Sequence, residues 1–133
     1  MTESPVAIPK EFARRLLGFE KALGKTAGEN RAVFRVCEKL RGPLGKRLGI
    51  DGFRSLLARA QMLAGAEVPW ILTLTIAGDG SLDGPKAKRD ARAVAEGEIV
   101  LVGHLLALLV LLIGPAVTLQ LLHDVWPGWA ITE

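Results

Sequence analysis

The feature that most constrains this chain is a nearly unbroken apolar run, Ile99–Ile113, which directly follows the charged segment Lys86–Glu98. His104 is its only polar side chain. The run is shorter than the roughly 20 apolar residues that a membrane-spanning helix needs. With Gly114–Leu122 added it could cross a bilayer, but Pro115 should break or kink the helix. A helix that is apolar on all sides is a membrane span or a helix enclosed by others, and the break favours the enclosed helix.

Length and composition agree with a single soluble domain. The chain has 133 residues, of which 50% are hydrophobic and 23% charged, and this balance is typical of a globular protein with a real core. The net charge of +3 gives a weak preference for an anionic partner. A single cysteine excludes an intrachain disulfide, and the first residues do not resemble a secretory signal. We therefore expect a cytoplasmic protein, with the inner membrane as the alternative location.

Glycine and proline divide the chain into helical segments with apolar residues at helical spacing. The expected helices are 9–23, 29–41, 51–64, 85–113 and 115–123. A capping box, Thr26–Glu29, should open the second helix, and the pair Gly42-Pro43 should end it. Leu44–Leu48 should then form a short turn before Asp51 caps the third helix.

The pattern changes at Leu72–Ile76, where apolar residues and threonines alternate. Strict alternation is typical of a half-buried strand, and Gly78–Ser81 is a turn that leads to a short return at Leu82. The expected fold class is mainly α, a compact bundle of five or six helices with one short strand or hairpin near 72–82. The single domain, 1–133, would comprise a basic helical part (9–65), a strand and turn (70–84), and the long apolar and terminal helices (85–124).

The residues that could carry chemistry do not form a convincing motif. Cys37 lies on the apolar face of its predicted helix, and we interpret His104 as a core histidine bonded to a glutamate or a backbone carbonyl. Asp79–Asp90 has the oxygen spacing of a calcium loop, but its last ligand is not the bidentate glutamate, and Lys86 and its basic neighbours repel a cation. We expect a turn there, with no metal, no cofactor, no catalytic residue and no enzymatic activity.

A basic cluster surrounds the helix–turn–helix-like segment RGPLGKRLGIDGFRSLLARA (41–60). Clustered cations can bind phosphate groups or an acidic partner, although few side chains here could read bases. The strand could pair with a partner chain through its backbone edge, and tryptophan is enriched at binding hot spots. Taken singly, Trp70 and Trp126 are interpreted as caps of the core. The candidate interaction surface comprises Arg41, Lys46, Arg47, Arg54, Arg59, Trp70, Thr73 and Thr75.

Three segments, GFRSLLARAQMLA (52–64), EVPW (67–70) and DVWP (124–127), resemble a set of small, mainly helical bacterial proteins of uncharacterised function. The resemblance covers roughly residues 33–127. It implies a soluble helical protein and brings no activity, cofactor or catalytic residue.

These observations together predict a non-enzymatic helical protein-interaction or assembly module, such as an adaptor, that binds a protein partner or a second copy of itself. Nucleic acid or anionic lipid is a less favoured partner. The alternative is a small single-span membrane protein with its span within 99–122 and a basic cytoplasmic domain. If the apolar run is enclosed, the core should contain Leu105, Leu108, Leu109 and Leu112.

Overall fold

The computed structural model describes residues 7–23, 32–84 and 91–128. Their secondary structure comprises the helices α1 (Ala7–Leu23), α2 (Ala32–Glu67), α3 (Ala91–Ile113) and α4 (Pro115–Val125), the 3-10 helix η1 (Pro69–Thr73), and the strands β1 (Thr75–Ile76) and β2 (Leu82–Asp83). The mainly helical class and the small hairpin are confirmed. The part of the chain described here has four α-helices, so the expected bundle of five or six is not confirmed.

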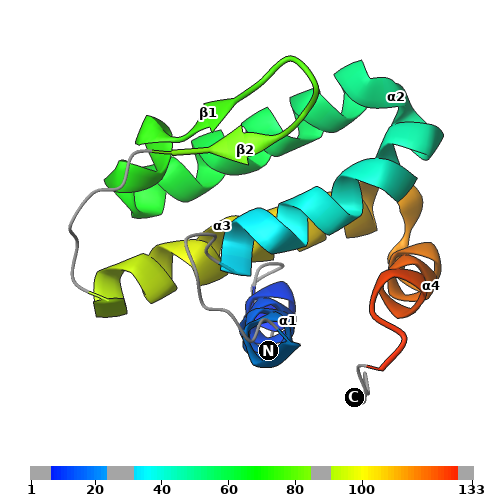
Figure 1. Ribbon diagram of the computed structural model, residues 1–133, viewed down its shortest axis with the longest axis horizontal. Coiled ribbons are helices and arrows are strands. Elements are labelled where there is room, and N and C mark those ends of the chain that lie inside the picture. The colour runs from blue at the N-terminus through cyan, green and yellow to red at the C-terminus, as the bar shows by residue number, and fades with distance from the viewer. Residues whose placement is uncertain (1–6, 24–31, 85–90, 129–133) are drawn as a thin grey trace, which may run out of the picture.

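The helix that carries the apolar run, α3, lies through the middle of the molecule. Figure 1 shows the second half of α2 and the hairpin above it, the first half of α2 in front of it, and α1 and α4 below it. α3 contacts α1, α2 and α4, and buried apolar side chains from all four helices form one core. Leu101, Leu105 and Leu109 are each at most 1% exposed. For most of its length, α3 is therefore the central core helix.

The predicted helix end at Gly42-Pro43 and the predicted turn Leu44–Leu48 are both wrong. α2 continues through Pro43 and changes direction only at Gly49, whose φ of 80° and ψ of 159° are not helical. A proline inside a helix costs about 3 kcal/mol relative to alanine. Burial of Leu44 offsets this cost, since it is 0% exposed and lies one turn after Leu40, which is also 0% exposed. Gly49 can make the break because a positive φ costs glycine little.

The predicted strand over Leu72–Ile76 is wrong except for its last two residues. Pro69 opens η1, and β1 begins only at Thr75, which pairs with Asp83 in a two-residue antiparallel hairpin. The Gln61 amide nitrogen donates to the carbonyl oxygens of Ile71 (3.0 Å) and Leu74 (2.8 Å). Because a side chain of α2 satisfies these carbonyls, this segment needs no neighbouring strand.

Two sequence expectations concern residues outside the described ranges. These are the capping box Thr26–Glu29 and the start of the long helix at Pro85. Where the description resumes, α3 is already helical at Ala91 and extends without a break to Ile113.

Candidate interaction surface

Two of the five predicted basic residues hold the hairpin against α2. Arg41 Nη1 donates to the carbonyl oxygen of Asp79 (3.2 Å), and Arg54 Nε donates to that of Ala77 (3.1 Å). Arg41 also forms an ion pair with Glu38 and lies 3.8 Å from the Asp79 carboxylate. These two arginines therefore help to hold the hairpin on α2, although the buried Arg41 Nε has no hydrogen-bond partner among the described residues.

The turn between the strands is built around Asp79. Its carboxylate accepts hydrogen bonds from the Ser81 hydroxyl (2.7 Å) and the Ser81 amide (3.0 Å). These bonds, with the nearby Arg41 charge, hold the pKa of Asp79 below its ordinary value. This is the turn role expected from the sequence. Asp90, the twelfth position of the calcium-like spacing, lies outside the described ranges.

The other three basic residues, Lys46, Arg47 and Arg59, are exposed and form no ion pair with any other described residue. Lys46 and Arg47 lie in the last turn before the bend of α2 at Gly49. Arg59 lies further along α2, beside the exposed Met62. The three cations of the predicted cluster that remain available to a partner are thus divided between the bend of α2 and a later stretch of the same helix.

Trp70 caps the core between η1 and α3, which is the simpler of its two expected roles. A Cβ added at Gly97 would lie 2.5 Å from the indole Cζ2, so the ring is packed directly on the α3 backbone. The indole N–H donates to the carbonyl of Ala93 at 3.4 Å, and the Thr73 hydroxyl donates to the Trp70 carbonyl at 2.7 Å. Thr75 is exposed on β1. The eight candidate residues therefore have different roles: Arg41 and Arg54 hold the hairpin, Trp70 packs on α3, and the other five are exposed.

A buried carboxylate joins the two ends of the described chain. Glu20 on α1 is 2% exposed and accepts hydrogen bonds from Lys39 Nζ (2.8 Å), Trp126 Nε1 (2.9 Å) and Arg35 Nε (3.1 Å). Burial by itself would raise the pKa of Glu20, but the three hydrogen bonds outweigh it and the pKa is lowered. The Lys39 ammonium also lies 5.9 Å from the centre of the Trp126 ring. Trp126 is 1% exposed, so its expected role as a core cap is confirmed.

The histidine in the apolar run has the partner that its position predicts. His104 Nε2 lies 2.7 Å from a carboxylate oxygen of Glu67 at the end of α2, and Lys10 Nζ lies 3.6 Å from the other oxygen. The hydrogen bond with His104, followed by the Lys10 charge, lowers the pKa of Glu67. This cluster joins α1, α2 and α3 at the middle of the apolar helix.

Cys37 is buried in the core, as its helical face predicts. It is 1% exposed, and burial raises the pKa of its thiol to about 12. Within residues 7–23, 32–84 and 91–128, no three histidine, cysteine, aspartate or glutamate side chains gather as metal ligands would.

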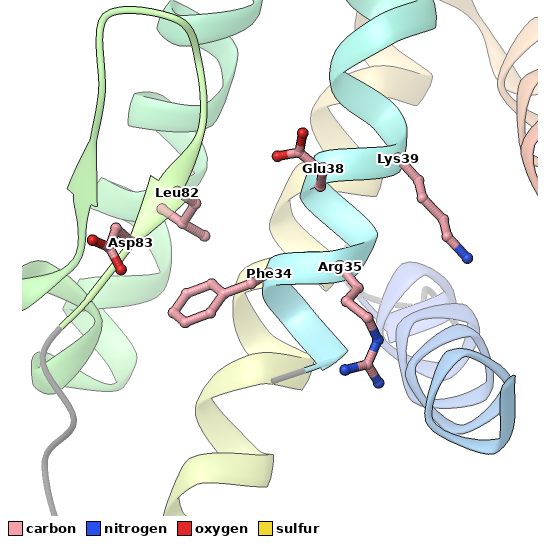
Figure 2. A pocket seen from close by; sticks show the side chains of 6 residues that line it. All are labelled: Phe34, Arg35, Glu38, Lys39, Leu82 and Asp83. Carbon is pink, nitrogen blue, oxygen red and sulfur yellow. The ribbon is translucent and has the colours of Figure 1, made fainter. Parts of the chain in front are cut away.

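A pocket of about 310 Å³ lies between the start of α2 and β2. Figure 2 shows the Phe34 ring directed toward β2, whereas Arg35 and Lys39 extend toward α1, where both bind Glu20. Of the carboxylates beside the pocket, Glu38 pairs with Arg41, and Asp83 accepts a hydrogen bond from the Gly84 amide (2.8 Å). The charged groups around the pocket are therefore engaged with the protein itself.

Among the described residues, the most exposed large apolar side chain lies where α3 meets α4. Leu111 is 81% exposed, followed nearby by Leu112 (56%) and Leu119 (37%). We name this surface the apolar end; its members, all exposed, are Leu111, Leu112, Pro115, Ala116 and Leu119.

The sequence did not reveal the apolar end, because it predicts that Leu112 is in the core. That prediction is wrong for Leu112, while Leu105 and Leu109 are both 0% exposed and Leu108 is partly buried. The physical reason is the turn at Gly114 (φ 88°), which takes the chain into α4 and leaves one face of the last turn of α3 uncovered. Figure 1 shows this turn and the bend of α2 at the same end of the molecule.

Comparison with family models, curated proteins and solved structures gives no match for this chain. The resemblance of its three short segments to small helical bacterial proteins stays a prediction.

Proposed function

We propose that this protein is a non-enzymatic helical interaction module of the cytoplasm that docks through its apolar end. The observation that carries the proposal is the exposure of Leu111 (81%) and Leu112 (56%) on a chain whose other α3 leucines are buried or partly buried. Exposed apolar side chains that are adjacent in space mark surfaces that a partner covers. An adaptor or an assembly subunit works in this way, because its activity is binding.

The polar groups that an enzyme would need are used to hold this fold together. Glu20 is surrounded by three donors, Glu67 binds His104 and Lys10, and Cys37 is enclosed in the core. A catalytic group must be reachable by a substrate and free to exchange a proton or a bond. These groups support the helix contacts instead, which favours binding over catalysis as the function.

The test compares two double variants. Each replaces two exposed apolar residues with glutamine, at a different place on the surface. Leu111→Gln/Leu112→Gln changes the apolar end, and Met62→Gln/Ala66→Gln changes an exposed face of α2; glutamine suits a helix at all four positions. We expect the first variant to lose self-association in sedimentation velocity, or partner capture by cross-linking in the native host, while the control retains both. Thermal denaturation should show both variants folded. If both variants associate as the wild type does, the proposal is wrong.

A second candidate function follows from α3 itself. Within Arg92–Ile113, an 18-residue window has a mean hydropathy of 2.2, so the helix is long and apolar enough to cross a membrane, although a core helix of a soluble protein meets the same criteria. As a span, α3 would have to leave the core that it forms with α1 and α2. Extraction of host membranes with alkaline carbonate decides between the two: a spanning protein stays in the pellet, and the interaction module is released or is never found there.

A further inference from the structure

We infer that the partner of the apolar end is the surface of an anionic lipid bilayer, to which the folded protein binds peripherally with Leu111 and Leu112 inserted among the headgroups. The inference rests on the proposed function, since it names a partner for that same surface. It differs from a membrane span, because the core around α3 stays intact.

The shape of the apolar end fits a fluid surface better than a helical peptide. Its side chains stand at the tip of a helical hairpin, and Leu111 is 81% exposed. A peptide helix docks in a groove between helices, whereas a projecting apolar tip can enter the boundary between headgroups and acyl chains to about 5–10 Å. A bilayer adapts to a convex tip without needing a matching cavity.

The turn at the tip pairs some of its own backbone groups. The Gly114 amide donates to the Val110 carbonyl at 2.9 Å, and the Gly114 carbonyl accepts from the amide and hydroxyl of Thr118 at 3.0 and 2.7 Å. Pro115 has no N–H to satisfy. Unpaired backbone groups are costly in hydrocarbon, so these bonds lower the cost of bringing the turn to the bilayer surface, while the unpaired groups at the two helix ends oppose deeper insertion.

The depth of insertion is limited by the sequence of α4. Its exposed face is apolar only through Leu119 and then becomes polar with Gln120, His123 and Asp124. The exposed face of α3 is polar at its distant end, where Arg92 and Glu96 lie. Within the pair α3 and α4, the large exposed apolar side chains therefore lie at the tip, as expected for a protein that lies on a membrane and does not cross it.

Charge complementarity identifies the lipid as anionic. Lys46 and Arg47 are exposed in the last turn before the bend of α2, and neither forms an ion pair with a described side chain. Figure 1 shows this bend at the same end of the molecule as the turn between α3 and α4. Arg41 and Arg54, also near the bend, are engaged by Glu38, Asp79 and Asp51. A charged bilayer attracts cations across about a Debye length. Lys46 and Arg47 therefore need not touch the lipid to contribute; they need only lie on the side of the protein that faces the bilayer.

The experiment measures co-sedimentation of the full chain with large unilamellar vesicles of phosphatidylcholine alone or with 30% phosphatidylserine. We expect binding to the anionic vesicles that high salt reverses, and much weaker binding to the neutral ones. Lys46→Ala/Arg47→Ala should weaken it by about 25-fold, since each cation near the surface contributes roughly a fivefold factor. The matched control Lys21→Ala/Arg59→Ala removes the same charge from exposed residues elsewhere and should have a much smaller effect. Leu111→Gln/Leu112→Gln should weaken binding by about tenfold or more.

A fluorescent label shows which part of the protein enters the lipid. Cys37 is 1% exposed, so a thiol introduced by Leu111→Cys or, as control, by Met62→Cys reacts selectively with an environment-sensitive dye. Anionic vesicles should shift the emission of the Leu111→Cys conjugate to the blue and leave the Met62→Cys conjugate unchanged. Equal shifts at both positions would overturn the inference.

The remaining outcomes separate this inference from the proposed function. Absence of binding to both vesicle types, or equal binding to both, overturns the lipid inference. If the wild type then still shows a self-association or protein complex that Leu111→Gln/Leu112→Gln abolishes, the interaction module stands with a protein partner. If Leu111→Gln/Leu112→Gln retains both vesicle binding and association with itself or a protein partner, the lipid inference and the proposed function are both overturned. A pellet that resists salt and alkaline carbonate overturns the inference in favour of α3 as a span.

Discussion

The two parts of α3 have nearly the same apolar composition but different surroundings. In the part of α3 that α1 and α2 cover, Leu105 and Leu109 are 0% exposed, whereas two and three residues after Leu109 the side chains of Leu111 and Leu112 are 81% and 56% exposed. Apolar side chains gain free energy from leaving water wherever the burial occurs. In the covered part α1 and α2 provide that burial, and at the apolar end it is still available to a partner. Hydropathy alone therefore does not distinguish a residue that builds the fold from one that binds.

The largest expected effect tests this comparison directly. Leu105→Ala should lower the free energy of unfolding by about 2–5 kcal/mol, because it leaves a cavity in the core. Leu111→Ala should change it by less than about 0.5 kcal/mol, because the side chain is already in water. Urea denaturation followed by circular dichroism measures both. Similar losses for the two variants would mean that Leu111 is covered in solution.

Glu20 on α1 bonds to side chains of α2 and to Trp126, which follows α4. We therefore expect its substitution to cause the next largest loss of stability. Glu20→Gln should cost about 1–3 kcal/mol, since it weakens hydrogen bonds to a buried charge. The matched control Glu11→Gln removes a carboxylate that forms only exposed ion pairs with Arg14 and Arg15, and should cost much less.

The effect of Glu20 should also depend on pH. Its folded-state pKa is lowered below its ordinary value, so its contribution is complete above its unfolded-state pKa and is lost as the pH falls through the folded-state value. The difference in unfolding free energy between wild type and Glu20→Gln should therefore shrink at acidic pH. A difference that stays constant from pH 7 down to pH 2 would contradict the ionic role.

A smaller loss of stability is expected where the Trp70 ring packs on α3 at Gly97. Gly97→Ala should cost about 1–2 kcal/mol, because the added methyl group would lie 2.5 Å from the Trp70 ring and the ring must move. Gly18→Ala is the control: nothing lies within 4 Å of its Cβ position, and alanine should stabilise α1 by about 0.5–1 kcal/mol. Melting temperatures that move in opposite directions would support both statements, whereas an unchanged melting temperature for Gly97→Ala would show that Trp70 does not cover α3.

The smallest loss of stability is expected for the polar contact between Glu67 and His104. Glu67→Gln should cost about 0.2–1 kcal/mol, since the Glu67 side chain is 43% exposed and solvent screens its interaction with His104. Because hydrogen bonding with His104 lowers the pKa of Glu67, the contribution is present above the ordinary pKa of the carboxyl and is lost below the folded-state value. Denaturation at pH 6 and pH 3 measures the change, and a larger cost at pH 3 would contradict this sign.

Local signals predict much of the fold when a residue's role depends on its own helix. His104 in an apolar run must find a hydrogen-bond partner, and a glutamate was among the expected partners. Cys37 follows its helical face into the core. Pro43 is the opposite case, because the gain from burying Leu44 against other helices outweighs the local cost of proline, and no pattern within the segment reports that gain.

The candidate site was less predictable because exposure is decided by neighbours that are distant in sequence. The alternation in Leu72–Ile76 fits a strand, but the Gln61 side chain on α2 satisfies the backbone there and a 3-10 helix forms. Arg41 and Arg54 are spaced like a binding face, yet the hairpin uses both. Leu112 lies within the apolar run and therefore looks like a core residue in the sequence. It is exposed only because of the direction in which α4 leaves at Gly114.

The contact between Glu20 and Trp126 has a consequence for how the chain is made. The two residues are 106 positions apart, and synthesis at about 5–20 residues per second takes roughly 5–20 s to cover that distance. During this time Glu20, Arg35 and Lys39 have already been synthesised, but the indole that completes their cluster has not. Native closure of this cluster must follow translation of α4 and Trp126, so until then the nascent chain keeps its apolar α3 uncovered on that side.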